Sequence, residues 1–164
     1  MYIQMNGRSF SSALCRNYVW RNFRNSIIAF CRMMARAYRA DLWEAIDIIA
    51  CGYGDNSFEE FREWLIGQGQ AIFEKALSDP DNLADLVSKE MAGTIYEYNM
   101  TSILREAYAA ITRSDEPIPF LGYPEEFSLI GRHEDYDDDS GYEKFPRITA
   151  KFGKCAEREF PFSY

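Results

Sequence analysis

No glycine or proline occurs between Gly7 and Gly52, and this uninterrupted stretch is the strongest constraint that the sequence places on the fold. Both residues interrupt helices, so their absence lets the chain continue in one regular structure. Apolar residues recur here every three or four positions, which is the period of an amphipathic helix. One long helix or two consecutive helices are therefore expected over residues 24–50, with an apolar face formed by Ile27, Phe30, Cys31, Met34, Tyr38, Leu42, Ala45, Ile46 and Ile49.

The next helix is expected to begin at Phe58. Ser57 and Glu60 have the spacing of a capping box, in which the hydroxyl and the carboxylate each bond a backbone N–H that lacks a partner. Gly67 and Gly69 interrupt the pattern, so a separate short helix is predicted over residues 71–77.

Two more helices are predicted before the character of the chain changes. Asp79-Pro80 is typical of a helix start and predicts a helix over residues 80–87. Apolar residues at helical spacing predict another over 100–111, which would begin between Lys89 and Met100. No strand of six alternating residues is evident, and the segment after residue 114 is rich in turn residues. The fold class is therefore predicted as all-α, a single-domain irregular helical bundle with a turn-rich C-terminal third.

Three segments are expected within this single domain. Residues 1–26 form a basic N-terminal segment with helical character, and residues 27–114 form the helical core. Residues 115–164 form an acidic and aromatic segment that packs on the core.

Charge is distributed unevenly along the chain. Residues 1–40 contain seven arginines, no lysine and no acid, whereas the whole chain has a net charge of −8, so residues 41–164 carry −15. This acidic balance opposes general binding to nucleic acid, which needs clustered basic side chains. Arg32, Arg36 and Arg39 form a stripe on one helix face, called here the Arg stripe. It is expected to be solvated, or to dock on the acidic part of the chain or on an anionic partner.

The four cysteines, Cys15, Cys31, Cys51 and Cys155, show neither C-x-x-C pairing nor zinc-ligand spacing. Four free thiols are therefore expected, some of them buried. No segment approaches the roughly 20 apolar residues that span a bilayer. A cytoplasmic protein without membrane association is the prediction.

Motifs for catalysis and metal binding are weak. The single histidine, His133, lies among acids and is expected to be a solvated loop residue, with a catalytic base as the alternative. An EF-hand loop needs glycine sixth and glutamate twelfth, but counting from Asp135 places glycine seventh and Pro146 twelfth. No glycine-rich phosphate loop is present. Neither a cofactor nor a metal is therefore predicted.

One block of sequence is specific. It contains the motif D-L-W-x-A at Asp41–Ala45 and, after Gly52 and Asp55, the motif F-x-x-F-R-x-W-L-I-G-x-G at Phe58–Gly69. Together these motifs resemble an uncharacterised bacterial family, a domain of unknown function, over about residues 36–112. The resemblance implies a mostly helical bacterial protein and brings no established activity. This chain departs from the family pattern by having Gly54-Asp55-Asn56 in place of Ser-Asp-Asp and by its Arg-rich start.

The same block suggests a candidate site at the turn between two adjoining helices. In a functional interpretation, polar and aromatic side chains form a groove for a partner or ligand there. In a structural interpretation, Asp55 sets the turn, Arg62 pairs with Asp41, and the tryptophans fill the core. In the functional interpretation, Trp64 is expected to be buried and Trp43 to lie nearer the surface of the groove. The residues of this predicted groove are Asp41, Trp43, Asp55, Asn56, Arg62 and Trp64.

An acidic, aromatic-rich domain without a catalytic motif is most simply interpreted as a non-catalytic protein-binding module. One form of it is an immunity-type protein that neutralises a basic toxin by charge complementarity. One alternative is a nucleic-acid-associated regulator that uses the Arg stripe and binds with steep salt dependence. The other is an enzyme that uses the carboxylates of Asp41, Asp55 or Glu60.

Overall fold

The structure is a computed structural model that describes residues 4–5, 8–9, 12–52, 54–95, 99–114, 116–118, 129–131 and 140–157. Two short strands come first, and they pair antiparallel, Gln4 with Ser9 and Met5 with Arg8. All other elements are helical, so the predicted all-α fold is confirmed. The elements are β1 (Gln4–Met5), β2 (Arg8–Ser9), α1 (Ser12–Arg36), α2 (Ala40–Ala50), α3 (Asp55–Gly67), α4 (Gln70–Ser78), η1 (Pro80–Asn82), α5 (Leu83–Leu86), η2 (Met91–Gly93), α6 (Met100–Thr112), α7 (Ser140–Lys144), α8 (Pro146–Phe152) and η4 (Cys155–Glu157).

The stretch without glycine or proline forms two helices, α1 and α2, rather than one. The chain leaves helical geometry after Arg36, and the backbone of Arg39 is extended. A distant segment pairs with this break, because Ile130 accepts a hydrogen bond from the Ala40 N–H and donates one to the Tyr38 carbonyl, both at 2.9 Å. The break is therefore stabilised by tertiary pairing, for which the local sequence carries no signal.

The main core lies between α2, α3 and α4 and the elements that follow them. Leu42, Ala45, Ile46 and Ile49 of α2 are buried, which confirms the apolar face predicted for this helix. These residues belong to one core cluster with the buried apolar side chains of α3, which are Phe58, Phe61, Trp64 and Leu65. Each such side chain contributes about 1.5–3 kcal/mol when removed from water.

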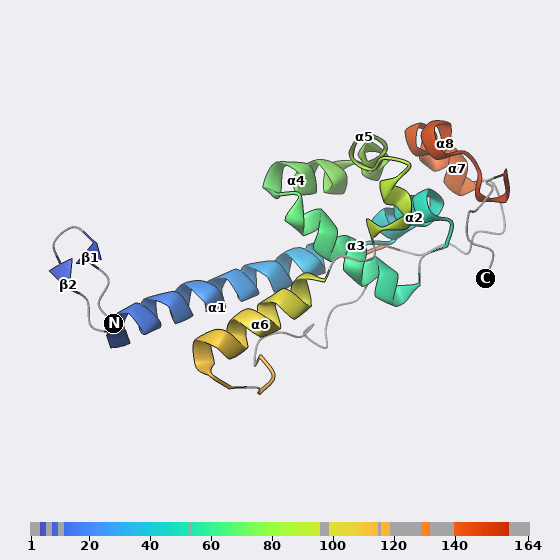
Figure 1. The fold of residues 1–164 in the computed structure, drawn as a ribbon. Coiled ribbons are helices and arrows are strands. Elements are labelled where there is room, and N and C mark those ends of the chain that lie inside the picture. The colour runs from blue at the N-terminus through green and yellow to red at the C-terminus, as the bar shows by residue number, and fades with distance from the viewer. Residues whose placement is uncertain are drawn as a thin grey trace.

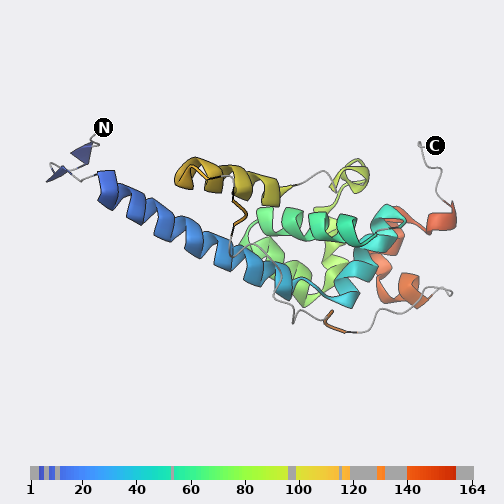
Figure 2. The same cartoon turned by 90° about the horizontal axis from the view of Figure 1, so that it is seen from below.

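Helix α1 lies beside α6, and its N-terminal end extends past the other helices, as Figures 1 and 2 show from two directions. A second, smaller core joins the two helices. It consists of Ile27, Tyr108 and Ile118, with Trp20, Phe23, Cys31 and Leu104 packed against them. No helix among the described residues is both long and apolar enough to cross a membrane.

Helix α3 begins at Asp55, three residues before the predicted start at Phe58. Gly54 occupies the N-cap position with an extended backbone, and no side chain caps this end. Ser57 therefore lies inside the first turn, and the predicted capping box is wrong. The helix begins earlier than predicted, with Gly54 as its N-cap and Asp55 as its first residue. Helix α6, in contrast, begins at Met100, at the later limit predicted for it.

The C-terminal helices α7 and α8 pack on α2, η1 and α5. Buried Asp81 of η1 accepts hydrogen bonds from the backbone N–H groups of Arg147, at 3.0 Å, and Ile148, at 2.9 Å. These are among the N–H groups that a helix start leaves without an internal partner. Buried Glu44 of α2 forms an ion pair with Lys144. Two buried acids of the core thus hold this C-terminal part in place.

The prediction of four free thiols is wrong, because Cys51 and Cys155 form a disulfide. The two residues are 104 positions apart, but the packing of the C-terminal helices brings their Cα atoms to 5.3 Å. This separation lies within the range that a disulfide spans. Cys31 is not part of a disulfide. Since disulfides are rare in the reducing cytosol, the cysteines no longer support the prediction of a cytoplasmic protein.

Candidate functional site

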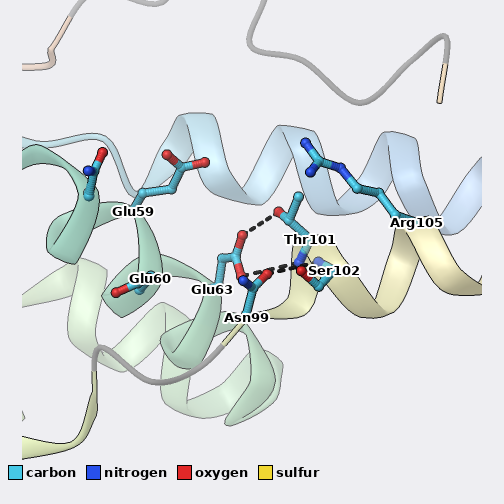
Figure 3. A pocket seen from close by; sticks show the side chains of 8 residues that line it. Glu59, Glu60, Glu63, Asn99, Thr101, Ser102 and Arg105 are labelled. Atoms are coloured by element: carbon cyan, nitrogen blue, oxygen red, sulfur yellow. Dashed lines mark hydrogen bonds between the residues drawn. The ribbon is translucent and has the colours of Figure 1, made fainter. Parts of the chain in front are cut away.

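A hollow of about 260 Å³ lies between α3 and α6, and we call it the α3–α6 hollow (Figure 3). Three carboxylates of α3 line it, which gives the hollow its acidic character. The α6 side contributes one amide, two hydroxyls and one guanidinium. The lining residues are Asn56, Glu59, Glu60, Glu63, Asn99, Thr101, Ser102 and Arg105.

Glu63 is the buried carboxylate of the hollow, with 2% of its surface exposed. It accepts hydrogen bonds from the backbone N–H groups of Met100, at 2.5 Å, and Thr101, at 3.2 Å. The Thr101 hydroxyl donates to its other oxygen (Figure 3). An anion at this position also interacts favourably with the positive end of the α6 dipole. Glu63 therefore holds α6 against α3 and forms the floor of the hollow.

Asn99 caps the N-terminus of α6. Its side-chain oxygen accepts a hydrogen bond from the Ser102 N–H at 2.8 Å, the usual role of an N-cap asparagine. The N–H groups of the first three helical residues are thus bonded by Glu63 and Asn99 together. This places Thr101 and Ser102 at the edge of the hollow in a fixed geometry.

Glu60 is the carboxylate of the hollow whose charge is least compensated. Burial raises its pKa above the usual 4.5, and the neighbouring charges of Glu63 and Glu59 raise it further. Among the described residues, no basic side chain forms an ion pair with Glu60. Arg105 extends from α6 on the side of the hollow where Glu59 lies (Figure 3). The hollow therefore keeps a negative charge that a cation would stabilise.

Of the six residues of the predicted groove, Asn56 alone lines the hollow. Trp43 and Arg62 belong to an aromatic stack on the opposite part of α3. Half-buried Trp43 stacks on Phe58 with ring centroids 4.6 Å apart. Buried Arg62 lies 4.8 Å from the ring centre of Tyr38 and 5.1 Å from that of Phe58.

Arg62 also has backbone partners, which explains how a buried guanidinium is accommodated. It donates hydrogen bonds to the carbonyl of Met34 at 3.1 Å and to that of Phe58 at 3.4 Å. Burying a charge is costly unless it is hydrogen-bonded and paired. Arg62 thus connects the end of α1 to α3.

The other three predicted groove residues lie apart from one another. Asp41 accepts hydrogen bonds from the Arg39 side chain, so its ion pair is with Arg39 rather than with Arg62. Asp55 is exposed at the start of α3. Trp64 is buried with 7% exposure, as expected, and Trp43 is less buried. The carboxylates of Asp41 and Asp55 do not line the hollow together with Glu60.

Most of the Arg stripe forms contacts with other side chains and carbonyls of the same chain. Arg36 forms two hydrogen bonds with the Glu74 carboxylate of α4, at 2.8 and 2.7 Å, and thereby lowers the pKa of that carboxyl. Arg39 bonds Asp41 and the Leu77 carbonyl. Arg32 is exposed. Two of its three members thus dock on the acidic part of the chain, which is one of the roles expected for the stripe.

Some of the proposed chemistry falls on residues that are not described. His133 and the acidic residues 134–139 lie outside the described residues. Within the described ranges, no group of three or more His, Cys, Asp or Glu is arranged to hold a metal ion.

Sequence reasoning named Asn56 and, as a possible catalytic acid, Glu60, but it missed Glu59, Glu63 and the α6 side of the hollow. The available signal was the spacing of Glu59, Glu60 and Glu63, which places acids on adjoining faces of one helix. That spacing does not reveal which helix packs opposite. Only the tertiary arrangement identifies the hollow.

Comparison with known proteins identifies a family but no individual relative. Neither the curated proteins nor the solved structures include a significant match to this chain. A family model described as "Protein of unknown function (DUF4240)" matches residues 23–110, which is more than half of the chain. The matched region runs from α1 through most of α6 and includes the aromatic stack and the hollow. The chain therefore belongs to the DUF4240 family, as the motifs at Asp41–Ala45 and Phe58–Gly69 suggested.

Proposed function

We propose that this protein is a non-catalytic protein-binding module whose α3–α6 hollow receives a basic segment of another protein. The observation that carries the proposal is that Glu59, Glu60 and Glu63 line one hollow together. Burial and the charges of Glu63 and Glu59 accordingly raise the pKa of Glu60. Bringing a cation next to Glu60 would relieve this repulsion. A lysine or arginine side chain of a partner is the natural source of such a cation.

The surroundings of Glu60 suit a peptide or protein surface. The hollow is open and polar, and its amides and hydroxyls offer hydrogen bonds to a partner backbone. Its volume of about 260 Å³ fits one or two side chains rather than a large cofactor. An immunity-type protein that neutralises a basic toxin is one role consistent with these properties.

An enzymatic role has weaker support. A carboxyl group with a raised pKa resembles a general acid. The other two carboxylates considered for catalysis, Asp41 and Asp55, do not face it across the hollow. The protein-binding proposal requires only the carboxylates that line the hollow and no further reactive group.

A hexa-arginine peptide with a fluorescent label tests the proposal through its anisotropy on titration with the protein. Glu60→Gln is expected to weaken binding about fivefold, equivalent to about 1 kcal/mol. Glu106→Gln, a control on the exposed side of α6, is expected to leave affinity unchanged. Binding should weaken as salt increases. Equal affinities for the two variants, or no binding by the wild type, would refute the proposal.

A further inference from the structure

Two large apolar side chains are exposed near the start of α1. Trp20 packs against the second core beside α6. Just before it, Tyr18 and Val19 are 62% and 47% exposed, although both are large and apolar. This end of the helix extends past α6 and away from the remaining helices (Figures 1 and 2).

Four exposed residues define what we call the outer face of α1. Tyr18, Arg21, Asn25 and Arg32 follow one another at intervals of three, four and seven, so they lie on one side of the helix. The opposite side carries Ile27, Phe30 and Met34, which are buried. Residues 12–36 contain no acid. The outer face thus combines an aromatic ring with two arginines, and it lies opposite the buried side of α1.

Charge decides which partner fits this face. Residues 41–164 carry −15, so a nucleic acid or an anionic membrane that approached Arg21 would also meet a strongly acidic molecule. Pairing of two outer faces would place arginines of the same sign together. An acidic protein surface avoids both penalties, and this chain itself carries one in the α3–α6 hollow.

We infer that the chain associates with a second copy of itself, with the outer face of α1 in one copy docking at the α3–α6 hollow of the other. The inference rests on the proposed function, since it supplies the basic segment that the hollow receives. Arg21 and Arg32 would bring their guanidinium groups to the carboxylates of Glu59 and Glu60. A reciprocal exchange of the two contacts closes a twofold dimer and leaves neither surface unused.

Sedimentation velocity of the full chain over a concentration series tests the inference by exchanging charges. The wild type is expected to form dimers that dissociate as salt is raised. Arg21→Glu with Arg32→Glu reverses the outer face, and Glu59→Lys with Glu60→Lys reverses the hollow. Each double variant alone is expected to associate at least tenfold more weakly, because equal charges then meet at both contacts.

An equimolar mixture of the two double variants should regain the dimer. In the mixture the reversed face meets the reversed hollow, and the two unchanged surfaces meet each other. Glu106→Lys serves as the matched control because it makes a charge reversal on α6 outside the hollow. It should dimerise like the wild type, and circular dichroism confirms that each variant is folded.

Three results would overturn the inference. A wild-type chain that remains monomeric at all concentrations, while hexa-arginine still binds in a Glu60-dependent manner, would refute self-association and leave the proposed function intact. A monomer that also fails to bind hexa-arginine would refute both. A monomer that binds a short DNA or RNA oligonucleotide, with binding lost in the Arg21→Glu, Arg32→Glu variant, would assign the outer face to nucleic acid instead.

Discussion

The Glu63 carboxylate accepts the backbone N–H of Met100 at 2.5 Å, although the two residues are 37 positions apart. A buried acid in the middle of α3 thus supplies the cap for a helix that begins far along the chain. Asp81 acts in the same way on α8, through the N–H groups of Arg147 and Ile148. In both cases an acid that would be costly to bury alone is satisfied by a helix N-terminus.

Replacing Glu63 by alanine should therefore destabilise the fold. The change leaves the N–H groups of Met100 and Thr101 without their partner, and the expected loss is about 1–3 kcal/mol in the free energy of unfolding. Urea denaturation followed by circular dichroism measures it. Glu106→Ala, at an exposed position of the same helix pair, should change stability by no more than about 0.5 kcal/mol. Equal effects of the two substitutions would show that Glu63 is not a cap.

The disulfide should contribute more to the stability of the fold than the Glu63 cap does. Cys51 and Cys155 close a loop of 104 residues, for which the chain-entropy model gives a stabilisation of about 4–5 kcal/mol. Reduction by dithiothreitol, or the substitution Cys51→Ser, should lower the urea midpoint accordingly. The Cys31→Ser variant should lose as much stability on reduction as the wild type does, because Cys31 takes no part in the disulfide. Alkylation of the denatured, unreduced protein, read by mass spectrometry, should leave Cys51 and Cys155 unlabelled; labelling of all four cysteines would exclude the bond.

The contrast between these features and the helices shows what the sequence can predict. Helix α6 and the apolar faces of α1 and α2 follow from local periodicity, because each apolar stripe must be buried somewhere. The disulfide and the Glu63 cap join positions far apart in the chain, so no local sequence pattern predicts them. The predicted start of α3 at Phe58 is wrong because two local signals lie close together, and the helix begins after Gly54 rather than after Ser57.

The candidate site likewise has a part that the sequence predicts and a part that depends on tertiary packing. The motif at Phe58–Gly69 carries the family resemblance, and most of its apolar residues are buried. A side chain such as Arg62 appears polar in the sequence, but the rings of Tyr38 and Phe58 enclose it in the structure. The hollow depends on where α6 lies against α3, and that placement is a tertiary property.

The two tryptophans of the family motifs should differ in their contribution to stability. Trp64 is 7% exposed and packs with its ring centre 5.9 Å from that of Phe61, so Trp64→Ala should cost about 3–5 kcal/mol. Trp43 is half-buried and stacks on Phe58, so Trp43→Ala should cost about 1–2 kcal/mol. A pair of urea denaturation curves gives both values. If Trp43→Ala is the more damaging change, the burial of the two rings has been assigned the wrong way round.

Glu60 should make stability depend on pH in the direction opposite to most acids. Burial and the charges of Glu63 and Glu59 raise its pKa in the folded state, so the folded chain binds a proton at Glu60 more readily than the unfolded chain does. Its ionised form therefore opposes folding above its folded pKa, and this cost disappears as the pH falls through that pKa.

Glu60→Gln should consequently stabilise the protein at pH 7, where the wild-type carboxyl is charged. The gain should shrink as the pH falls below the folded pKa of Glu60, because the wild-type side chain then becomes neutral as well. Urea denaturation of both proteins at pH 7, 6, 5 and 4 measures this difference directly. Asp85 provides the matched contrast: Arg147 and Lys75 lower its pKa by hydrogen bonding, so Asp85→Asn should destabilise at pH 7. A stability gain for Glu60→Gln that is constant across the pH series would show that its cause is packing rather than charge.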